Sequence, residues 1–245
     1  EGFNKLASKV PFTFSLGNHD MGSAPGKFAD ERNTEMANAY FDLQALMDKS
    51  NVMASFPEGT VDNLCSKFKI AGSTWLVFSL EFGPRNKTID WVDQIIAKHP
   101  EAKIIINTHA YLFEDNTLHG GDHWWQPQDY GIGKETGREA VNNGEQLWNK
   151  LVKKHPGIRM VFSGHILKSG VGKLVSVGDH GNKVYQMLAN YQKGVVGSKN
   201  GGNGFLRIVK VDLKKEEISV STYSPWLDAY KEDPENDFSF ENVKF

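Results

Sequence analysis

The spacing of apolar residues along the chain alternates between a helical and a strand-like period. Apolar residues recur every three or four positions within three polar stretches, which predicts amphipathic helices. Short apolar or alternating runs bounded by Gly, Pro and Asn predict strands between them. The predicted helices are 30–49, 88–99 and 144–155. The predicted strands are 11–16, 64–70, 74–82, 102–107, 158–163, 173–177, 183–189, 204–213 and 217–223.

The order of these elements predicts an α/β fold. Helices alternate with strands as far as about residue 164, and only strands separated by Gly-rich turns follow. Such an order is typical of layered proteins in which helices cover a sheet. Residues 71–73, Ala-Gly-Ser, predict a hairpin between two strands. Residues 1–11 are typical of the end of an amphipathic helix, so the chain is expected to begin inside an α/β unit.

Composition narrows the class of protein. The 245 residues are 39% hydrophobic and 24% charged, the balance of a globular domain. A net charge of −2 gives no general attraction to nucleic acid, so no nucleic acid partner is expected. No apolar run is long enough to span a bilayer, and no signal-peptide pattern opens the chain. The single cysteine, Cys65, excludes an intrachain disulfide, and no partner protein is evident.

Three predicted strands are each followed by a histidine. Residues 98–109 (KHPEAKIIINTH) and 154–165 (KHPGIRMVFSGH) share a helix end, a His-Pro stop, an apolar strand and a final His. Residues 8–19 (SKVPFTFSLGNH) have the same outline. In open α/β sheets, ligands bind at the carboxyl ends of the strands. The residues that we expect to meet there are Asn18, His19, His109 and His165.

The alternative for each of these histidines is a structural role, in which it caps its strand and bonds a neighbouring loop. Three histidines at the same structural position, beside Asn18 and two glycines, favour a functional site instead. His99 and His155 are interpreted differently, because they lie at helix ends before Pro. A protonated imidazole there interacts favourably with the helix dipole, so both are predicted to be structural.

The residues at the three strand ends also carry a family resemblance. Gly17-Asn18-His19-Asp20, the lone His109 and the pair Gly164-His165 resemble, in this order, motifs of the calcineurin-like metallophosphoesterase superfamily. The resemblance implies a four-layer α/β/β/α sandwich. It further implies one metallophosphoesterase-like domain over residues 1–230, followed by a C-terminal tail, 231–245. Other short segments resemble a bacterial branch that is often exported, which implies a periplasmic or extracellular location.

The same resemblance implies a site for two divalent metals. Asn18, His109 and His165 would be ligands of one metal ion, and Mn, Fe and Zn suit imidazole and amide ligands. His19 would donate a proton to the leaving group instead of binding metal. Asp20 would orient His19 or its loop; a plain loop-capping role is the alternative.

Two departures from the family pattern stand out. The family's Asp-x-His and Gly-Asp-x-x-Asp motifs do not occur in the sequence, so the first strands and several metal ligands are expected to be missing from this chain. Leu167 stands where the family usually has the second His of Gly-His-x-His. Weak activity is therefore expected of the chain as given. Upstream residues are expected to supply the missing ligands; the alternative is that the family site was never complete in this protein.

A long Gly-rich loop, 115–137, follows the strand that leads to His109. Loops of this length are often functional. His119, His123, Trp124 and Trp125 could therefore frame a substrate pocket, and His123 and Trp124 are the candidate substrate-binding residues. The two tryptophans could equally pin the loop onto the body of the protein. Asn190, at the end of a later strand, is a further candidate for the lining of the cleft.

The leading functional prediction is metal-dependent hydrolysis of a phosphate mono- or diester, with a small-molecule or phosphorylated substrate. The alternative is a non-catalytic binding module, in which a degenerate metal site holds a phosphorylated or glycan ligand. Leu167 favours the alternative. The pair Asn18-His19 favours the enzyme, because a protein that only binds its ligand has little use for His19.

Overall fold

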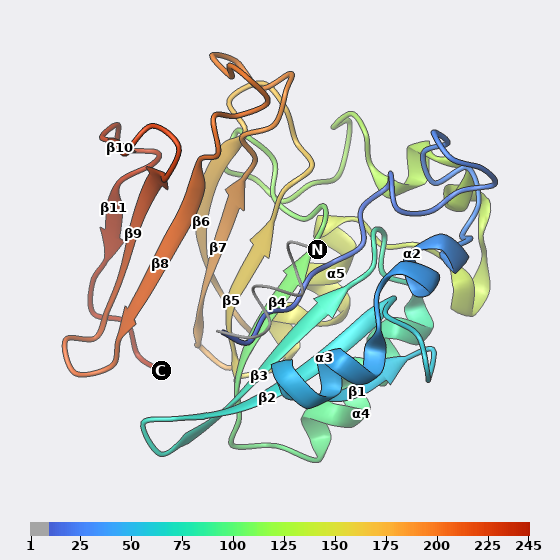
Figure 1. The fold of residues 1–245 in the computed structure, drawn as a ribbon. Coiled ribbons are helices and arrows are strands. Elements are labelled where there is room, and N and C mark those ends of the chain that lie inside the picture. The colour runs from blue at the N-terminus through green and yellow to red at the C-terminus, as the bar shows by residue number, and fades with distance from the viewer. Residues whose placement is uncertain (1–9) are drawn as a thin grey trace.

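The computed structural model describes residues 10–245, and most of the helix expected at 1–11 lies outside them. Seven strands form a mixed sheet in the order β1-β2-β3-β4-β5-β7-β6 (Figure 1). These strands are β1 (Val52–Phe56), β2 (Asn63–Ile70), β3 (Ser73–Leu80), β4 (Lys103–Thr108), β5 (Ile158–Ser163), β6 (Val171–Val177) and β7 (Lys183–Ala189). A second sheet contains β8 (Leu206–Asp212), β9 (Glu217–Ser224), β10 (Ala229–Lys231) and β11 (Phe238–Phe240), with β9 pairing with each of the others.

The centre of the large sheet is parallel. β3, β4, β5 and β7 run in the same direction, whereas β1, β2 and β6 pair antiparallel at the two sides. The loops that follow β3, β4 and β5 therefore lie together, on the side of the sheet where these strands have their carboxyl ends. This topology, and not proximity in sequence, brings distant segments of the chain together.

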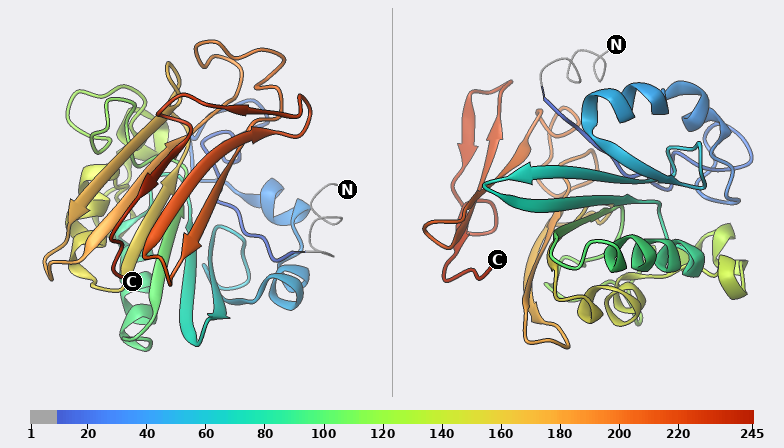
Figure 2. Two further views of the ribbon diagram at one scale, coloured as in Figure 1. Left: turned by 90° about the vertical axis from the view of Figure 1, so that its left-hand side faces the viewer. Right: turned by 90° about the horizontal axis from the view of Figure 1, so that it is seen from below.

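The two faces of the large sheet are covered differently (Figure 2). The helices α4 (Asn86–Ala97) and α5 (Gly144–Lys150) lie on one face. Their apolar residues, such as Val92 and Leu147, pack with Leu76 and Phe78 of β3 in one core. On the other face, Trp75 of β3 belongs to a second core shared with the small sheet. Alternate residues of β3 thus fill separate cores, which is the period-2 pattern of a strand buried on both faces.

The mixed α/β fold with two packed sheets is confirmed. Within residues 10–245, no helix covers the outer face of the small sheet, where Leu206 and Ile208 of β8 are exposed. The expected boundary after residue 230 falls inside β10, and the tail contributes β11 and the buried Val243. The division into a domain and a tail stays a prediction.

Two predicted elements are wrong. Residues 11–16 form no strand; Thr13 Oγ1 lies 2.7 Å from Ser79 Oγ, and Ser15 Oγ donates to the Asn107 carbonyl at 3.0 Å. The segment is held against β3 and β4 by side chains, with no backbone ladder. The helix predicted at 30–49 is two helices, α2 (Glu35–Tyr40) and α3 (Leu43–Ser50). Asp42 causes the division, because its carboxylate accepts from Ala45 N–H and starts α3 afresh.

The remaining differences are three additional strands and the ends of two helices. Within residues 10–245, the strands that were not predicted are β1, directly after α3, and the short β10 and β11 near the C-terminus. Helix α4 begins two residues before Thr88, and α5 ends at Lys150, with a short 3₁₀ turn (Val152–Lys154) after it. Three further 3₁₀ turns shape the loop before α5, at Pro127–Asp129, Gly131–Lys134 and Gly137–Glu139. In the part of the chain that the structure describes, no helix is both long and apolar enough to cross a membrane.

Candidate functional site

The parallel strands β4 and β5 deliver two histidines to one edge of the sheet. His109 directly follows β4, and His165 lies two residues after β5. The loops are tied together, because Gly164 N–H donates to the His109 carbonyl at 3.0 Å. His165 has a positive φ of 69°, which is uncommon for a non-glycine residue. Such a conformation persists where the surrounding contacts hold it in place, and it often marks a functional site.

The structure brings together three of the residues that the sequence analysis selected. His109 Nε2 lies 3.0 Å from Asn18 Oδ1 and 3.2 Å from His165 Nδ1. Asn18 and His165 are buried, with exposed fractions of 4% and 6%. His19 does not join them: it is exposed, and its ring packs against Phe28 with centroids 4.2 Å apart.

The hydrogen bond on the far side of His165 defines its tautomer. His165 Nε2 lies 3.0 Å from the carbonyl oxygen of Trp125, which only accepts, so Nε2 carries the proton. In the neutral ring, Nδ1 therefore presents its lone pair toward His109. Trp125 has a φ of 61°, so two residues in the left-handed region meet at this contact.

The donor set fits a divalent cation. An amide oxygen and two imidazole nitrogens converge, with 3.0 and 3.2 Å between neighbouring donor atoms. Two ligand atoms at right angles, each about 2.1 Å from one ion, are about 3.0 Å apart. Among residues 10–245, no group of three or more His, Cys, Asp and Glu side chains is arranged to hold a metal. The candidate set is thus two histidines and one asparagine.

Burial keeps both imidazoles neutral. It lowers the pKa of His109 to about 3, with the nearby His165 and His19 acting in the same direction. Burial also lowers the pKa of His165 to about 4, although the bond to the Trp125 carbonyl opposes this shift. Both rings are therefore uncharged at neutral pH, which is the form in which histidine binds metals.

The turn that carries Asn18 needs its glycine. A Cβ on Gly17 would lie only 2.8 Å from His109 Cε1, so a larger residue would displace the imidazole. Asp20 closes the turn, because its Oδ2 accepts from Gly17 N–H at 2.8 Å. This contact is that of a loop-capping carboxylate; a part for Asp20 in orienting His19 stays a prediction.

Two aromatic residues around the site were missed by the sequence analysis. Phe82 is fully buried, with its ring centroid 5.6 Å from that of His109 and 5.2 Å from that of His165. Asn18 Nδ2 donates to the Tyr130 hydroxyl at 3.4 Å, which turns Oδ1 toward His109. The only signal for Tyr130 was its place in the long loop, 115–137. Trp125, which the sequence analysis weighed as a pocket residue or as an anchor of this loop, supplies the carbonyl described above.

The three predicted substrate-binding residues make other contacts. His123 stacks on Phe113, with centroids 3.9 Å apart, and its Nε2 lies 3.4 Å from an Asp115 carboxylate oxygen. Trp124 packs against the core beneath α4 and α5. Asn190 donates to the Ile166 carbonyl at 2.9 Å, just beyond His165. Their role in substrate binding stays a prediction.

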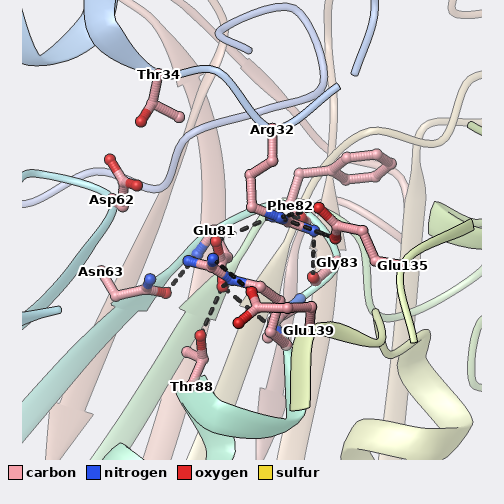
Figure 3. Close-up of polar contacts among 12 residues, drawn as sticks. Arg32, Thr34, Asp62, Asn63, Glu81, Phe82, Gly83, Thr88, Glu135 and Glu139 are labelled. Atoms are coloured by element: carbon pink, nitrogen blue, oxygen red, sulfur yellow. Dashed lines mark hydrogen bonds and ion pairs between the residues drawn. The ribbon is translucent and has the colours of Figure 1, made fainter. Parts of the chain in front are cut away.

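A buried ionic network holds the loop against the sheet beside the site (Figure 3). Glu81, one residue before Phe82, is 1% exposed and lies 3.0 Å from both Arg32 Nη1 and Arg85 Nε. Arg32 also contacts Glu135 at 2.9 Å, and Arg85 contacts Glu139 at 3.1 Å. Glu81 thus joins β3 to the segment before α2 and to the 3₁₀ turns that contain Tyr130.

Comparison with known proteins adds independent findings. A family model described as calcineurin-like phosphoesterase matches residues 1–169. The uncharacterized protein YvnB of Bacillus subtilis (strain 168) is 27% identical over 227 residues, which cover 90% of this chain. The chain spans 15% of the length of that relative. No solved structure gives a significant match.

Proposed function

Because the chain belongs to the calcineurin-like phosphoesterase family, we propose that it hydrolyses a phosphate mono- or diester with a divalent metal held by Asn18, His109 and His165. The observation that carries this proposal is the convergence of one amide oxygen and two imidazole nitrogens at the edge of a parallel sheet. When bound, such an ion polarises a phosphoryl oxygen and lowers the pKa of a bound water. Imidazole and amide ligands suit Zn²⁺, Mn²⁺ and Fe²⁺.

His19 is proposed as the proton donor to the leaving group. It directly follows Asn18, so it neighbours a proposed ligand in the chain without belonging to the ligand set. The ring is exposed and contacts Phe28, which leaves its nitrogens accessible to a substrate. A group in this position can protonate the oxygen that departs from phosphorus.

Replacing His19 with alanine should lower turnover and leave metal binding intact. General acid assistance typically contributes ~10²–10⁴-fold, and esters with good leaving groups need less of it. We therefore expect a large loss of kcat/KM for alkyl esters and a small one for nitrophenyl esters. Steady-state kinetics across a series of leaving groups, with Mn²⁺ titration calorimetry, measures both effects. The matched control is His180→Ala, which removes an exposed histidine elsewhere. An equal loss for every leaving group contradicts the acid role.

Tyr130 is proposed to position the amide of Asn18. Its hydroxyl accepts from Asn18 Nδ2, so the change Tyr130→Phe frees the amide to rotate. Loss of a residue that hydrogen-bonds to a metal ligand typically weakens metal binding ~10–100-fold. The bond from Asn18 to Tyr130 is long, at 3.4 Å, so we expect an effect of about tenfold. Calorimetric titration with Mn²⁺ measures the effect, with Tyr230→Phe on the exposed β10 as the matched control. Unchanged affinity in a folded Tyr130→Phe variant argues against the positioning role.

The second candidate function is a binding module that holds a phosphorylated or glycan ligand without turnover. Leu167 supports it, because this residue stands where the family usually has a metal-binding histidine. An assay with p-nitrophenyl phosphate and bis(p-nitrophenyl) phosphate, in the presence of Mn²⁺, separates the two candidates. Metal-dependent release of nitrophenol supports the enzyme, whereas binding of phosphate without any release supports the binding module.

A further inference from the structure

An open cavity of about 460 Å³ lies beside the proposed proton donor. The loop after Asn18 forms one wall, and α2 forms the other. His19 and Asp20 are among the residues that line it, and His19 directly follows a proposed metal ligand, Asn18. The apolar residues in its walls include Met21, Pro25, Met36, Ala37, Tyr40 and Phe41.

The walls of the cavity are mainly apolar, although they are open to water. Met36 and Tyr40 are 66% and 77% exposed, which is unusual for side chains of this size. Lys27, Asn33 and Glu35 supply polar atoms among the lining residues. Methionine and tyrosine side chains offer polarisable surfaces that pack well on flat rings. The volume lies within the range of about 300–1,000 Å³ that is usual for small-molecule sites.

From this arrangement we infer that the cavity binds the leaving group of the substrate, and that this group is flat and apolar, such as an aryl or arylmethyl alcohol. The inference rests on the proposed phosphoester hydrolysis. His19 lines the cavity, so a leaving oxygen that departs toward His19 carries its alcohol toward the cavity. The phosphoryl group would lie at the metal held by Asn18, His109 and His165, and the cavity walls would hold the carbon skeleton of the departing alcohol.

The kinetic test compares two esters whose alcohols have similar acidity, 2-naphthylmethyl phosphate and methyl phosphate, so that only the bulk of the leaving group differs. Burial of the ring system should raise kcat/KM for the naphthylmethyl ester by about tenfold or more. The double variant Met36→Ala, Tyr40→Ala should reduce this ratio. The matched control, Met47→Ala, Tyr230→Ala, removes one exposed methionine and one exposed tyrosine elsewhere and should preserve it.

A binding test does not depend on turnover. Methyl-labelled methionine gives separate NMR signals for the six methionines, and 2-naphthylmethanol serves as the probe. We expect shifts at Met21 and Met36 and none at Met160 and Met187, which are buried between the two sheets. Met36→Leu assigns the key signal.

The outcomes separate this inference from the proposed function. Equal kcat/KM for the two esters, an unchanged ratio in the cavity variant, or no shift at Met36 overturns the inference. If neither of these monoesters nor bis(p-nitrophenyl) phosphate is hydrolysed, the proposed function fails, and the methionine shifts alone decide whether the cavity takes a flat apolar group.

Discussion

Replacing both His109 and His165 with alanine is expected to abolish binding of Mn²⁺ and Zn²⁺ and to reduce phosphoester hydrolysis to background. The double change removes His109 Nε2, which lies 3.0 Å from Asn18 Oδ1, and His165 Nδ1, which lies 3.2 Å from His109 Nε2, and so takes away two of the three proposed ligand atoms. The remaining amide oxygen of Asn18 is a weak ligand alone. The loss of metal affinity should therefore exceed the ~10–100-fold effect of removing a residue that only hydrogen-bonds to a ligand. Elemental analysis after dialysis against metal-free buffer, together with calorimetric titration, measures it.

The matched control removes two histidines from elsewhere in the chain. His99→Ala, His180→Ala should bind metal like the unchanged protein, because neither residue contacts the candidate site. Circular dichroism establishes that both double variants are folded. A folded His109→Ala, His165→Ala variant with unchanged metal content would show that the ions bind somewhere else.

Replacing Glu81 with glutamine is expected to destabilise the fold by about 3–5 kcal/mol, because it removes the buried carboxylate that two guanidinium groups share and leaves them only their more exposed partners, Glu135 and Glu139. The side chains of Glu81 and Arg32 are 1% and 6% exposed. Urea denaturation measures the change in the free energy of unfolding. The matched control is Glu139→Gln. The side chain of Glu139 is 46% exposed and also pairs with Arg85. We expect less than about 1 kcal/mol from this exposed pair.

The contribution of Glu81 should also depend on pH. Burial alone would raise the pKa of its carboxyl, but Arg32 and Arg85, with hydrogen bonds from Arg85 and Thr88, outweigh burial and hold the pKa below the ordinary 4.5. A depressed pKa in the folded state means that the stabilisation is complete above the unfolded-state value and is lost as pH falls through the folded-state value. The stability difference between the unchanged protein and Glu81→Gln should therefore shrink below about pH 4.5. A difference that is constant down to acid pH would contradict an ionised Glu81.

The effects of Glu81→Gln on activity follow from its position. Glu81 directly precedes Phe82, and the arginines that it pairs with hold the 3₁₀ turns around Tyr130. Loosening of this network should disturb the aromatic surroundings of the candidate site before the strands themselves separate. The ionic network is thus a support for the site as well as for the fold.

Much of the candidate site could be predicted from the chain alone. The strands that end before His109 and His165 have continuous apolar runs, and such strands are typical of the centre of a parallel sheet. Since the carboxyl ends of parallel strands share one edge, the convergence of these histidines follows from local patterns and general topology. The same local period correctly indicates the central strands and helix α4.

Residues 11–16 and 30–49 show the limit of local patterns. Both have the period of a regular element, yet the first is held against β3 and β4 by its own side chains, and the second is divided at Asp42. An alternating pattern predicts a strand only if a neighbouring strand offers its backbone edge. A helical pattern does not reveal an internal residue whose side chain caps a new helix.

The sequence thus determined which ligand-type residues reach the edge of the sheet, whereas the tertiary structure alone decided how they are oriented. The tautomer of His165 depends on the carbonyl of Trp125, and the amide of Asn18 is turned by Tyr130. Glu81 acquires its role only when Arg32, from a distant segment, joins the nearby Arg85 around it. The physical reason is that periodicity records burial on one face of an element. Hydrogen bonds and ion pairs between remote segments depend instead on atomic distances that exist only in the folded chain.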